Sequence, residues 1–114
     1  NQILDLGDCK IENSKLKINT GTNATMTSTI EIQDNNVSSF EVRAKPNDDC
    51  DISYFEVSND GGLTFSQQYN LVGFLNTPLN FSTPGKPVQA KITLRSDADN
   101  SKPELDNFVL IVKR

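Results

Sequence analysis

The sequence predicts an all-β protein, an antiparallel β-sandwich that forms one domain over residues 1–114. Hydrophobic and polar residues alternate with a period of two along most of the chain, as they do in strands with one buried face. Stretches rich in Gly, Pro, Asn and Asp separate the alternating segments and supply the backbone conformations of tight reversals. No window keeps a helical period over three turns. Strands at this spacing, without helical crossovers, indicate two packed antiparallel sheets.

Four strands follow directly from this alternation. Their hydrophobic residues alternate with Lys, Thr, Glu, Arg or Gln, so one face of each strand is expected to point into the core. The expected inward residues are Leu16 and Ile18, then Met26, Ser28, Ile30 and Ile32, then Phe40, Val42 and Ala44, and finally Val88, Ala90, Ile92 and Leu94.

Two further segments are predicted from composition. Residues 108–112 are consecutively apolar, which favours a strand that is central to a sheet and buried on both faces. The segment 70–87 contains three prolines, which favours a long surface loop.

The stretch SNDGGLTF, residues 58–65, matches the Ser-x-Asp-x-Gly-x-Thr-Phe pattern of the Asp-box found in sialidases. In the structural interpretation Asp60 accepts hydrogen bonds from turn amides, and the glycines adopt positive φ. The flanking segments YFEV and TFSQQY would be the strands of a hairpin. The alternative, a catalytic role, has little support because the box occurs once and the chain is too short for a propeller. The residues assigned to the structural turn are Ser58, Asp60, Gly62, Thr64 and Phe65, with Phe65 anchoring the turn to the core.

Charge and hydropathy exclude several classes of binding partner. The formal net charge of −4 and a pI near 4.7 argue against nucleic acid and against anionic membranes. No apolar run approaches the roughly 18 residues of a membrane span, so membrane insertion is not expected. The first residues show no signal peptide, and the chain is expected to be a fragment of a longer protein.

Catalytic and metal-binding residues are scarce. The chain has no His and no Cys-x-x-Cys pair, which argues against a zinc site and against most enzymes. Cys9 and Cys50 either form a structural disulfide or remain two inert thiols, and their spacing does not decide between these. We therefore predict that the protein is not an enzyme and has no cofactor.

Two acidic segments carry the hard oxygen ligands that Ca²⁺ prefers. Asp48, Asp49 and Asp51 form one candidate for a structural calcium ion, and Asp97, Asp99 and Asn100 form a second. Neither matches an EF-hand loop, so the alternative is a solvated acidic loop in each case.

Three aromatic residues fall in or beside the expected loop at 70–87. Tyr69, Phe74 and Phe81 are the candidates for a ligand-binding patch, and packing within the loop is the alternative. Asn-x-Ser/Thr sequons occur at Asn23, Asn36 and Asn80, a number expected by chance in an Asn-rich chain.

The C-terminal third, GKPVQAKITLRSDADNSKPELDNFVLIVKR, resembles the ending of galactose-binding-like β-sandwiches of the discoidin and carbohydrate-module type. Modules of this type often carry a hairpin similar to Ser58–Phe65 in mid-domain, and they occur in bacteriophage tail and baseplate proteins and beside secreted glycan-active enzymes. The resemblance implies a jelly roll in which Pro103 ends a loop and Leu105 starts the last strand. It implies a core that contains Ile92, Leu94, Leu105, Phe108 and Leu110.

Together these observations favour a non-enzymatic structural or adhesive module of a larger extracellular assembly, most consistent with a bacteriophage tail or baseplate protein. Its expected partners are other domains of the same assembly, with a cell-surface glycan as a further partner, and its expected location is the virion or the extracellular space. The alternative is an accessory carbohydrate-binding module of a secreted hydrolase.

Overall fold

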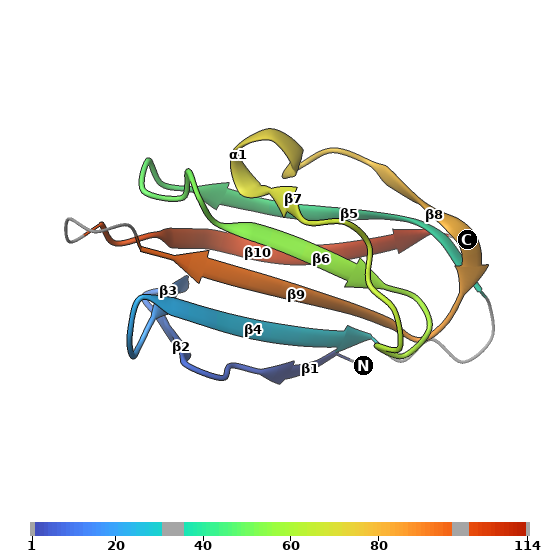
Figure 1. Ribbon diagram of the computed structural model, residues 1–114, viewed down its shortest axis with the longest axis horizontal. Coiled ribbons are helices and arrows are strands. Elements are labelled where there is room, and N and C mark those ends of the chain that lie inside the picture. Colours follow the sequence, from blue (N-terminus) through green and yellow to red (C-terminus); the bar gives the residue numbers. More distant parts are fainter. Residues whose placement is uncertain (1, 31–35, 97–100, 114) are drawn as a thin grey trace.

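The computed structural model describes residues 2–30, 36–96 and 101–113. Within these ranges the chain forms ten strands and one short helix (Figure 1). The elements are β1 (Gln2–Asp5), β2 (Cys9–Glu12), β3 (Lys15–Ile18), β4 (Asn23–Ile30), β5 (Val37–Pro46), β6 (Tyr54–Ser58), β7 (Tyr69–Asn70), α1 (Leu71–Phe74), β8 (Leu79–Gly85), β9 (Val88–Arg95) and β10 (Glu104–Lys113).

The strands form two five-stranded antiparallel sheets, so the predicted β-sandwich is confirmed. The first sheet has the order β1-β4-β9-β6-β7, and the second has the order β2-β3-β10-β5-β8. When β1 and β2 are set aside, the remaining eight strands have the order of a jelly roll, with the first strand, β3, beside the last, β10. The two N-terminal strands extend one side of the jelly roll, β1 next to β4 and β2 next to β3 (Figure 1).

The core lies between the two sheets and is built from the predicted alternating positions. In β9 the four inward residues are fully buried, and in β5 the inward residues Phe40, Val42 and Ala44 are buried as well. In β4 the inward residues Met26 and Ser28 are buried and Ile30 packs against the core, whereas Ile32 lies outside the described residues. The period-two pattern therefore identified the inner faces of both sheets.

The C-terminal strand β10 occupies the middle of its sheet, as predicted, but it is not buried on both faces. Leu105 and Leu110 are buried, whereas Val109 on the outer face is 50% exposed. An extra residue in β10 shifts the register with β5 between Asp106 and Val109, and Asn107 takes a positive φ of 57° within this bulge. The bulge reverses the alternation of inward and outward side chains along β10. Leu105 and Leu110, which are five positions apart, therefore both point into the core.

The segment 70–87 differs most from the prediction of a loop. It contains the short helix α1 and the edge strand β8, which pairs with β5. Pro84 lies within β8, and an edge strand tolerates proline because only one side of it pairs in the sheet. The alternation of Leu79 and Phe81 was a strand pattern, and both residues pack against the core.

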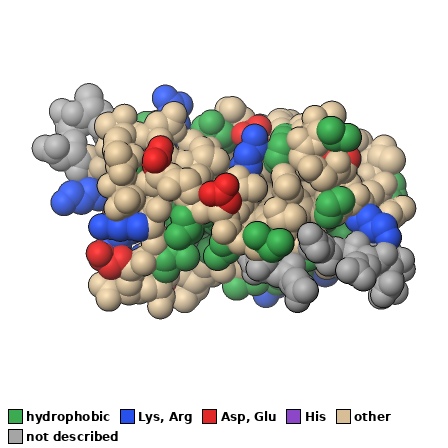
Figure 2. All heavy atoms as spheres, turned by 90° about the horizontal axis from the view of Figure 1, so that it is seen from below, with side chains coloured by type: hydrophobic (Ala, Val, Ile, Leu, Met, Phe, Trp, Pro, Cys, Tyr) green, Lys and Arg blue, Asp and Glu red, His purple; other side chains and the backbone are tan. Residues whose placement is uncertain are grey.

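The face formed by β1 and β2 exposes several hydrophobic side chains. Figure 2, which views the molecule from below, shows hydrophobic side chains at the surface between polar ones. Ile3, Leu4 and Ile11 are the large exposed hydrophobic residues of these two strands. Among the described residues, no helix is long or apolar enough to cross a membrane.

Because of the bulge, substitutions on the two faces of β10 are expected to differ in their effect on stability. Leu105→Ala is expected to lower the free energy of unfolding by about 2–5 kcal/mol, because it opens a cavity in the core. Val109→Ala, on the outer face of the same strand, is expected to cost about 1 kcal/mol or less. Chemical denaturation of both variants measures the difference, and equal losses would show that the strand alternates without a bulge.

Candidate functional site

The Asp-box residues form a hydrogen-bonded turn after β6. The hydroxyl oxygen of Ser58 accepts from the backbone N–H groups of Asp60 at 3.2 Å and Gly62 at 3.0 Å, and the same hydroxyl donates to Asp60 Oδ1 at 2.6 Å. The Asp60 carboxylate also accepts from the backbone N–H of Thr64 at 3.0 Å and from the Thr64 hydroxyl. Gly61 and Gly62 have positive φ values of 75° and 92°. These contacts close the loop locally.

The chain does not return as a hairpin directly after this turn. The predicted strand TFSQQY is absent except for Tyr69, which begins the two-residue strand β7. The Asp60 carboxylate holds Thr64 in the turn, and Ser66 is the next residue to contact β6, before Tyr69 pairs with it. The N–H of Ser66 donates to the Val57 carbonyl at 2.9 Å, and the Ser66 hydroxyl accepts from the Val57 N–H at 3.0 Å.

Phe65 is not part of the core, contrary to the expectation. Its ring is half-buried, and the ammonium of Lys91 lies 4.0 Å from the ring centroid. Lys91 alternates in β9 with the buried Ala90 and Ile92, so it and Phe65 lie on the outer face of the first sheet. A cation–π contact therefore holds this end of the loop.

The variable second residue of the box, Asn59, connects the loop to the other sheet. Its side-chain amide donates to the backbone carbonyl of Val37 at 3.1 Å and to that of Thr83 at 2.7 Å. β5 and β8 part here, because their register shifts between Val37 and Ser39. The Asn59 amide thus satisfies carbonyls in the region where the ladder is interrupted.

The three predicted ligand-binding aromatic residues belong to one cluster around Phe40. Tyr69 stacks on Phe55 with ring centroids 5.3 Å apart and meets Phe40 edge-on at 6.3 Å. Phe81 packs on Phe40 at 4.7 Å, and Phe74 packs on Tyr69 at 5.1 Å. The cluster joins β7 at the edge of one sheet to β8 at the edge of the other.

A groove of about 260 Å³ opens beside this cluster, and we call it the aromatic groove. Tyr69, Phe81 and Phe65 line it, whereas Phe74 does not line it but packs against Tyr69. No Lys, Arg, Asp or Glu is among the described residues of its lining. The polar side chains that line it include Thr64, Ser66, Gln67 and Asn80, and those of Gln67 and Asn80 are exposed. Half-buried rings beside uncharged hydrogen-bonding groups suit a neutral polyhydroxylated ligand.

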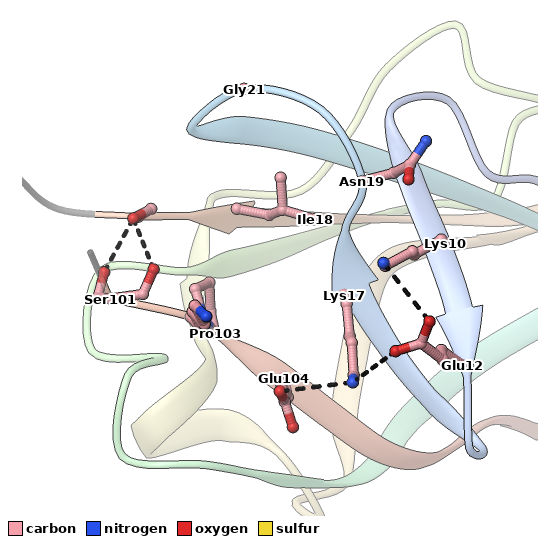
Figure 3. Close-up of a pocket in the computed structure, with 11 residues that line it drawn as sticks. Lys10, Glu12, Lys17, Ile18, Asn19, Gly21, Ser101, Pro103 and Glu104 are labelled. Carbon is pink, nitrogen blue, oxygen red and sulfur yellow. Dashed lines mark hydrogen bonds and ion pairs between the residues drawn. The ribbon is translucent and has the colours of Figure 1, made fainter.

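A second hollow, of about 410 Å³, lies where β2, β3 and β10 meet the segment around Ser96 and Ser101 (Figure 3). We call it the charged groove. Lys17 Nζ lies 3.1 Å from Glu12 Oε1 and 3.8 Å from Glu104 Oε2, and Lys10 Nζ lies 3.6 Å from Glu12 Oε2. The hydrogen bond from Lys17, followed by the charge of Lys10, lowers the pKa of the Glu12 carboxyl.

The residues of this charged groove neutralise one another across adjacent strands. Figure 3 shows Lys10, Glu12, Lys17 and Glu104 joined in a continuous chain of contacts. Cross-strand ion pairs of this kind stabilise a sheet modestly and are a common surface feature. The aromatic groove is the better candidate for ligand binding, because it combines aromatic rings with the exposed side-chain amides of Gln67 and Asn80 instead of ion pairs.

The acidic segment after β5 is held by its own hydrogen bonds. Asn47 Oδ1 accepts from the backbone N–H groups of Asp49 and Glu104, and Asp49 Oδ2 accepts from the Lys102 N–H at 3.0 Å. Within the described part of the chain, no three His, Cys, Asp or Glu residues gather into a group suited to a metal ion. Calcium binding by Asp48, Asp49 and Asp51 stays a prediction, and Asp97, Asp99 and Asn100 lie outside the described residues.

Cys9 and Cys50 are free and buried in this structure. Burial, and to a smaller extent Asp8, raises the pKa of the Cys9 thiol to about 11, and burial also raises the pKa of the Cys50 thiol. Nearby acidic residues raise both thiol pKa values less than burial does. Both are therefore protonated and inert as nucleophiles at neutral pH. The sequon residues Asn23, Asn36 and Asn80 are all exposed.

Comparison with known proteins found no match to this chain among protein-family models, curated proteins or solved structures. The resemblance to galactose-binding-like modules therefore remains a prediction.

Sequence reasoning found Tyr69 and Phe81 but missed the residues that complete the groove. Gln67 and Asn80 carry no motif for a ligand site, because Gln and Asn are common on any surface. Asn59 occupies a position that the box leaves variable. The alternation of Leu79 and Phe81 with Asn80 and Ser82 could have predicted a strand here, with Phe81 against the core and Asn80 exposed.

Asn59→Ala is expected to lower the free energy of unfolding by about 1–3 kcal/mol, because two carbonyls would lose their donor. Thermal or chemical denaturation measures this loss. Gln67→Ala, a change in the same loop at an exposed side chain, is the matched control and is expected to stay within about 0.5 kcal/mol. If both variants unfold like the parent protein, the Asn59 bridge does not stabilise the fold.

The hydrogen bonds of the turn also predict that the stability of the protein depends on pH. The hydrogen bond from Ser58, followed by those from Thr64, lowers the pKa of the Asp60 carboxyl to about 2. Since the carboxyl has a pKa of about 3.9 in an unfolded chain, its stabilising contribution is complete above about pH 4 and is lost as the pH falls through about 2.

Ser58→Ala is expected to move the pKa of Asp60 upward, toward the ordinary value, because it removes the largest cause of the shift. Titration of the side-chain carboxyl by carbon-13 NMR measures it. Ser82→Ala, an exposed serine in β8, is the control and should leave the pKa unchanged. An unaltered Asp60 titration in Ser58→Ala would contradict this account of the turn.

Proposed function

We propose that this chain is a non-enzymatic adhesion module that binds glycan in the aromatic groove and serves a larger extracellular assembly. The observation that carries the proposal is that Tyr69 and Phe81 lie beside uncharged polar side chains in one groove, where the edge strands β7 and β8 of the two sheets are close together. Rings offer apolar faces to the C–H groups of a sugar, and amides and hydroxyls exchange hydrogen bonds with its hydroxyl groups.

The rings of Tyr69 and Phe81 are held in place by other aromatic residues, which favours a role in ligand binding. Tyr69 is held between Phe55, Phe40 and Phe74, and Phe81 rests on Phe40, which is buried. Rings fixed in this way lose little freedom when a ligand covers them, so little of the binding free energy is spent on ordering them. The exposed Gln67 and Asn80 lie in the same groove and can adjust to the hydroxyl pattern of the ligand.

The chemistry of the side chains supports a role in binding rather than catalysis. The sequence has no His, and its only two thiols are buried with raised pKa values. No acid or base is among the described residues that line the aromatic groove, so general acid–base catalysis has no side chain there to carry it.

The parent assembly is proposed from the resemblance of the C-terminal third together with the Asp-box. Both favour a bacteriophage tail or baseplate protein, located on the virion or in the extracellular space, with neighbouring domains of that assembly as further partners. An accessory carbohydrate-binding module of a secreted hydrolase would use the same groove. The genes that neighbour the full-length gene distinguish the two, since tail genes accompany the first and a hydrolase domain accompanies the second.

Binding is tested with a glycan array followed by isothermal titration of the glycans that bind. We expect affinities between millimolar and micromolar, and we expect Gln67→Ala and Asn80→Ala each to weaken binding about two- to tenfold through loss of a neutral hydrogen bond. These two side chains are exposed, so the variants keep the fold. Tyr69→Ala should abolish binding.

Leu63→Ala is the matched control, because Leu63 is 86% exposed on the same loop but does not line the groove. Phe74→Ala, which removes only the support behind Tyr69, should have a smaller effect than Tyr69→Ala. If no glycan binds the parent protein, the adhesion function is wrong and a structural role in the assembly is left.

A further inference from the structure

We infer that the ligand is a linear, uncharged oligosaccharide, bound along a track that joins the aromatic groove to a second groove beside it. This inference rests on the proposed function and adds the size and charge of the ligand. The second groove, which we call the polar groove, has a volume of about 620 Å³ and is lined by residues that include Asp60, Thr83 and Lys86.

The size of the aromatic groove is the first argument. Its volume of about 260 Å³ lies below the range of about 300–1,000 Å³ that is usual for small-molecule sites. Alone, it would hold a small part of a glycan and leave the remainder in solvent. The polar groove offers more than twice that volume next to it.

The two grooves are adjacent. Asn59, Thr64 and Ser82 line both of them, so three shared residues lie between the aromatic rings of one groove and Asp60 and Lys86 of the other. A ligand long enough to extend past these three residues therefore reaches from Tyr69 or Phe81 into the polar groove, where the Asp-box loop meets β8.

Two of the three shared residues are fixed before a ligand arrives. Asn59 is held by two backbone carbonyls, and Thr64 is held by the Asp60 carboxylate. The loop lies directly against β8, because a Cβ added at Gly85 would come within 2.4 Å of the Asn59 backbone oxygen. A pre-formed track of this kind favours an extended ligand, since each additional sugar unit binds without ordering more of the protein.

The charge of the track determines the class of glycan. The aromatic groove has no charged residue in its described lining, and the polar groove has one acid, Asp60, and one base, Lys86. An acidic glycan would bring its carboxylates or sulfates beside Asp60 without an excess of basic residues to balance them. Sugar hydroxyl groups, in contrast, need no opposite charge and can exchange hydrogen bonds with the side-chain hydroxyl of Thr83.

The test compares ligands of increasing length by isothermal titration. Neutral mono-, di-, tetra- and hexasaccharides of the linkage selected on the glycan array are titrated into the parent protein, with uronate-containing oligosaccharides as acidic counterparts. We expect the hexasaccharide to bind about tenfold or more tightly than the monosaccharide, and the acidic ligands to bind less tightly than the neutral ones of equal length.

Thr83→Ala combined with Lys86→Ala changes two exposed side chains of the polar groove only. We expect this variant to lose about threefold or more in affinity for the hexasaccharide and to keep the affinity of the parent for the monosaccharide. Lys45→Ala, at an exposed lysine of β5 that lines neither groove, is the control.

Affinities that do not rise with length, or a rise that the double variant leaves intact, would overturn the extended track while leaving the proposed function in place. Tighter binding of the acidic ligands would overturn the assignment of an uncharged glycan. Absence of binding at every length would instead contradict the proposed function itself.

Discussion

The structure depends on one constraint: each sheet has a single apolar face, and the two faces must cover each other completely. β9 and β5 meet this requirement with unbroken runs of inward residues. The constraint is hardest to satisfy at the sides of the sandwich, where the edge strands are short and the inner layer would otherwise be open to water. On one side β1 and β2 extend the sheets, and on the other α1, β8 and the Asp-box loop surround the edges (Figure 1).

The candidate site lies on the side of the sandwich that α1, β8 and the Asp-box loop cover, and it results from the way these elements cover it. β7 has two residues, so it cannot cover the edge of its sheet, and β8 departs from β5 after a short ladder. Aromatic side chains fill the space between the sheets, and the Asn59 amide supplies hydrogen bonds that the strands do not make. Rings and amides placed there for structural reasons also form the surface that we propose binds glycan, so stability and binding share the same residues.

The sequence predicted the sandwich and most of its inner faces, because the period of two is a direct result of strand geometry. It predicted Tyr69, Phe74 and Phe81 as a group for a different reason, their position in a supposed loop, whereas the structure joins them through Phe40 from a distant strand. Local patterns do not report such long-range contacts. Proline content concealed β8, since the tolerance of an edge strand for proline depends on which strand becomes the edge. Phe65 lies on the outer face of its sheet, where it contacts Lys91, which is also remote in sequence.

The bulge at Asn107 bears on how uniquely the chain specifies its own register. Residues 108–112 are apolar at every position, so either set of alternating side chains could form an inner face. Hydrophobicity alone leaves these two arrangements nearly equivalent, and one additional residue selects between them by bringing Leu110 and Val112 opposite Val42 and Phe40. If Asn107 joined the ladder as an ordinary strand residue, the segment would invert and exchange Leu110 for Val109 and Ile111 at the interface, whereas deletion of Asn107 would remove the bulge and leave Leu110 opposite Val42. A single backbone position thus encodes the choice between two folded alternatives.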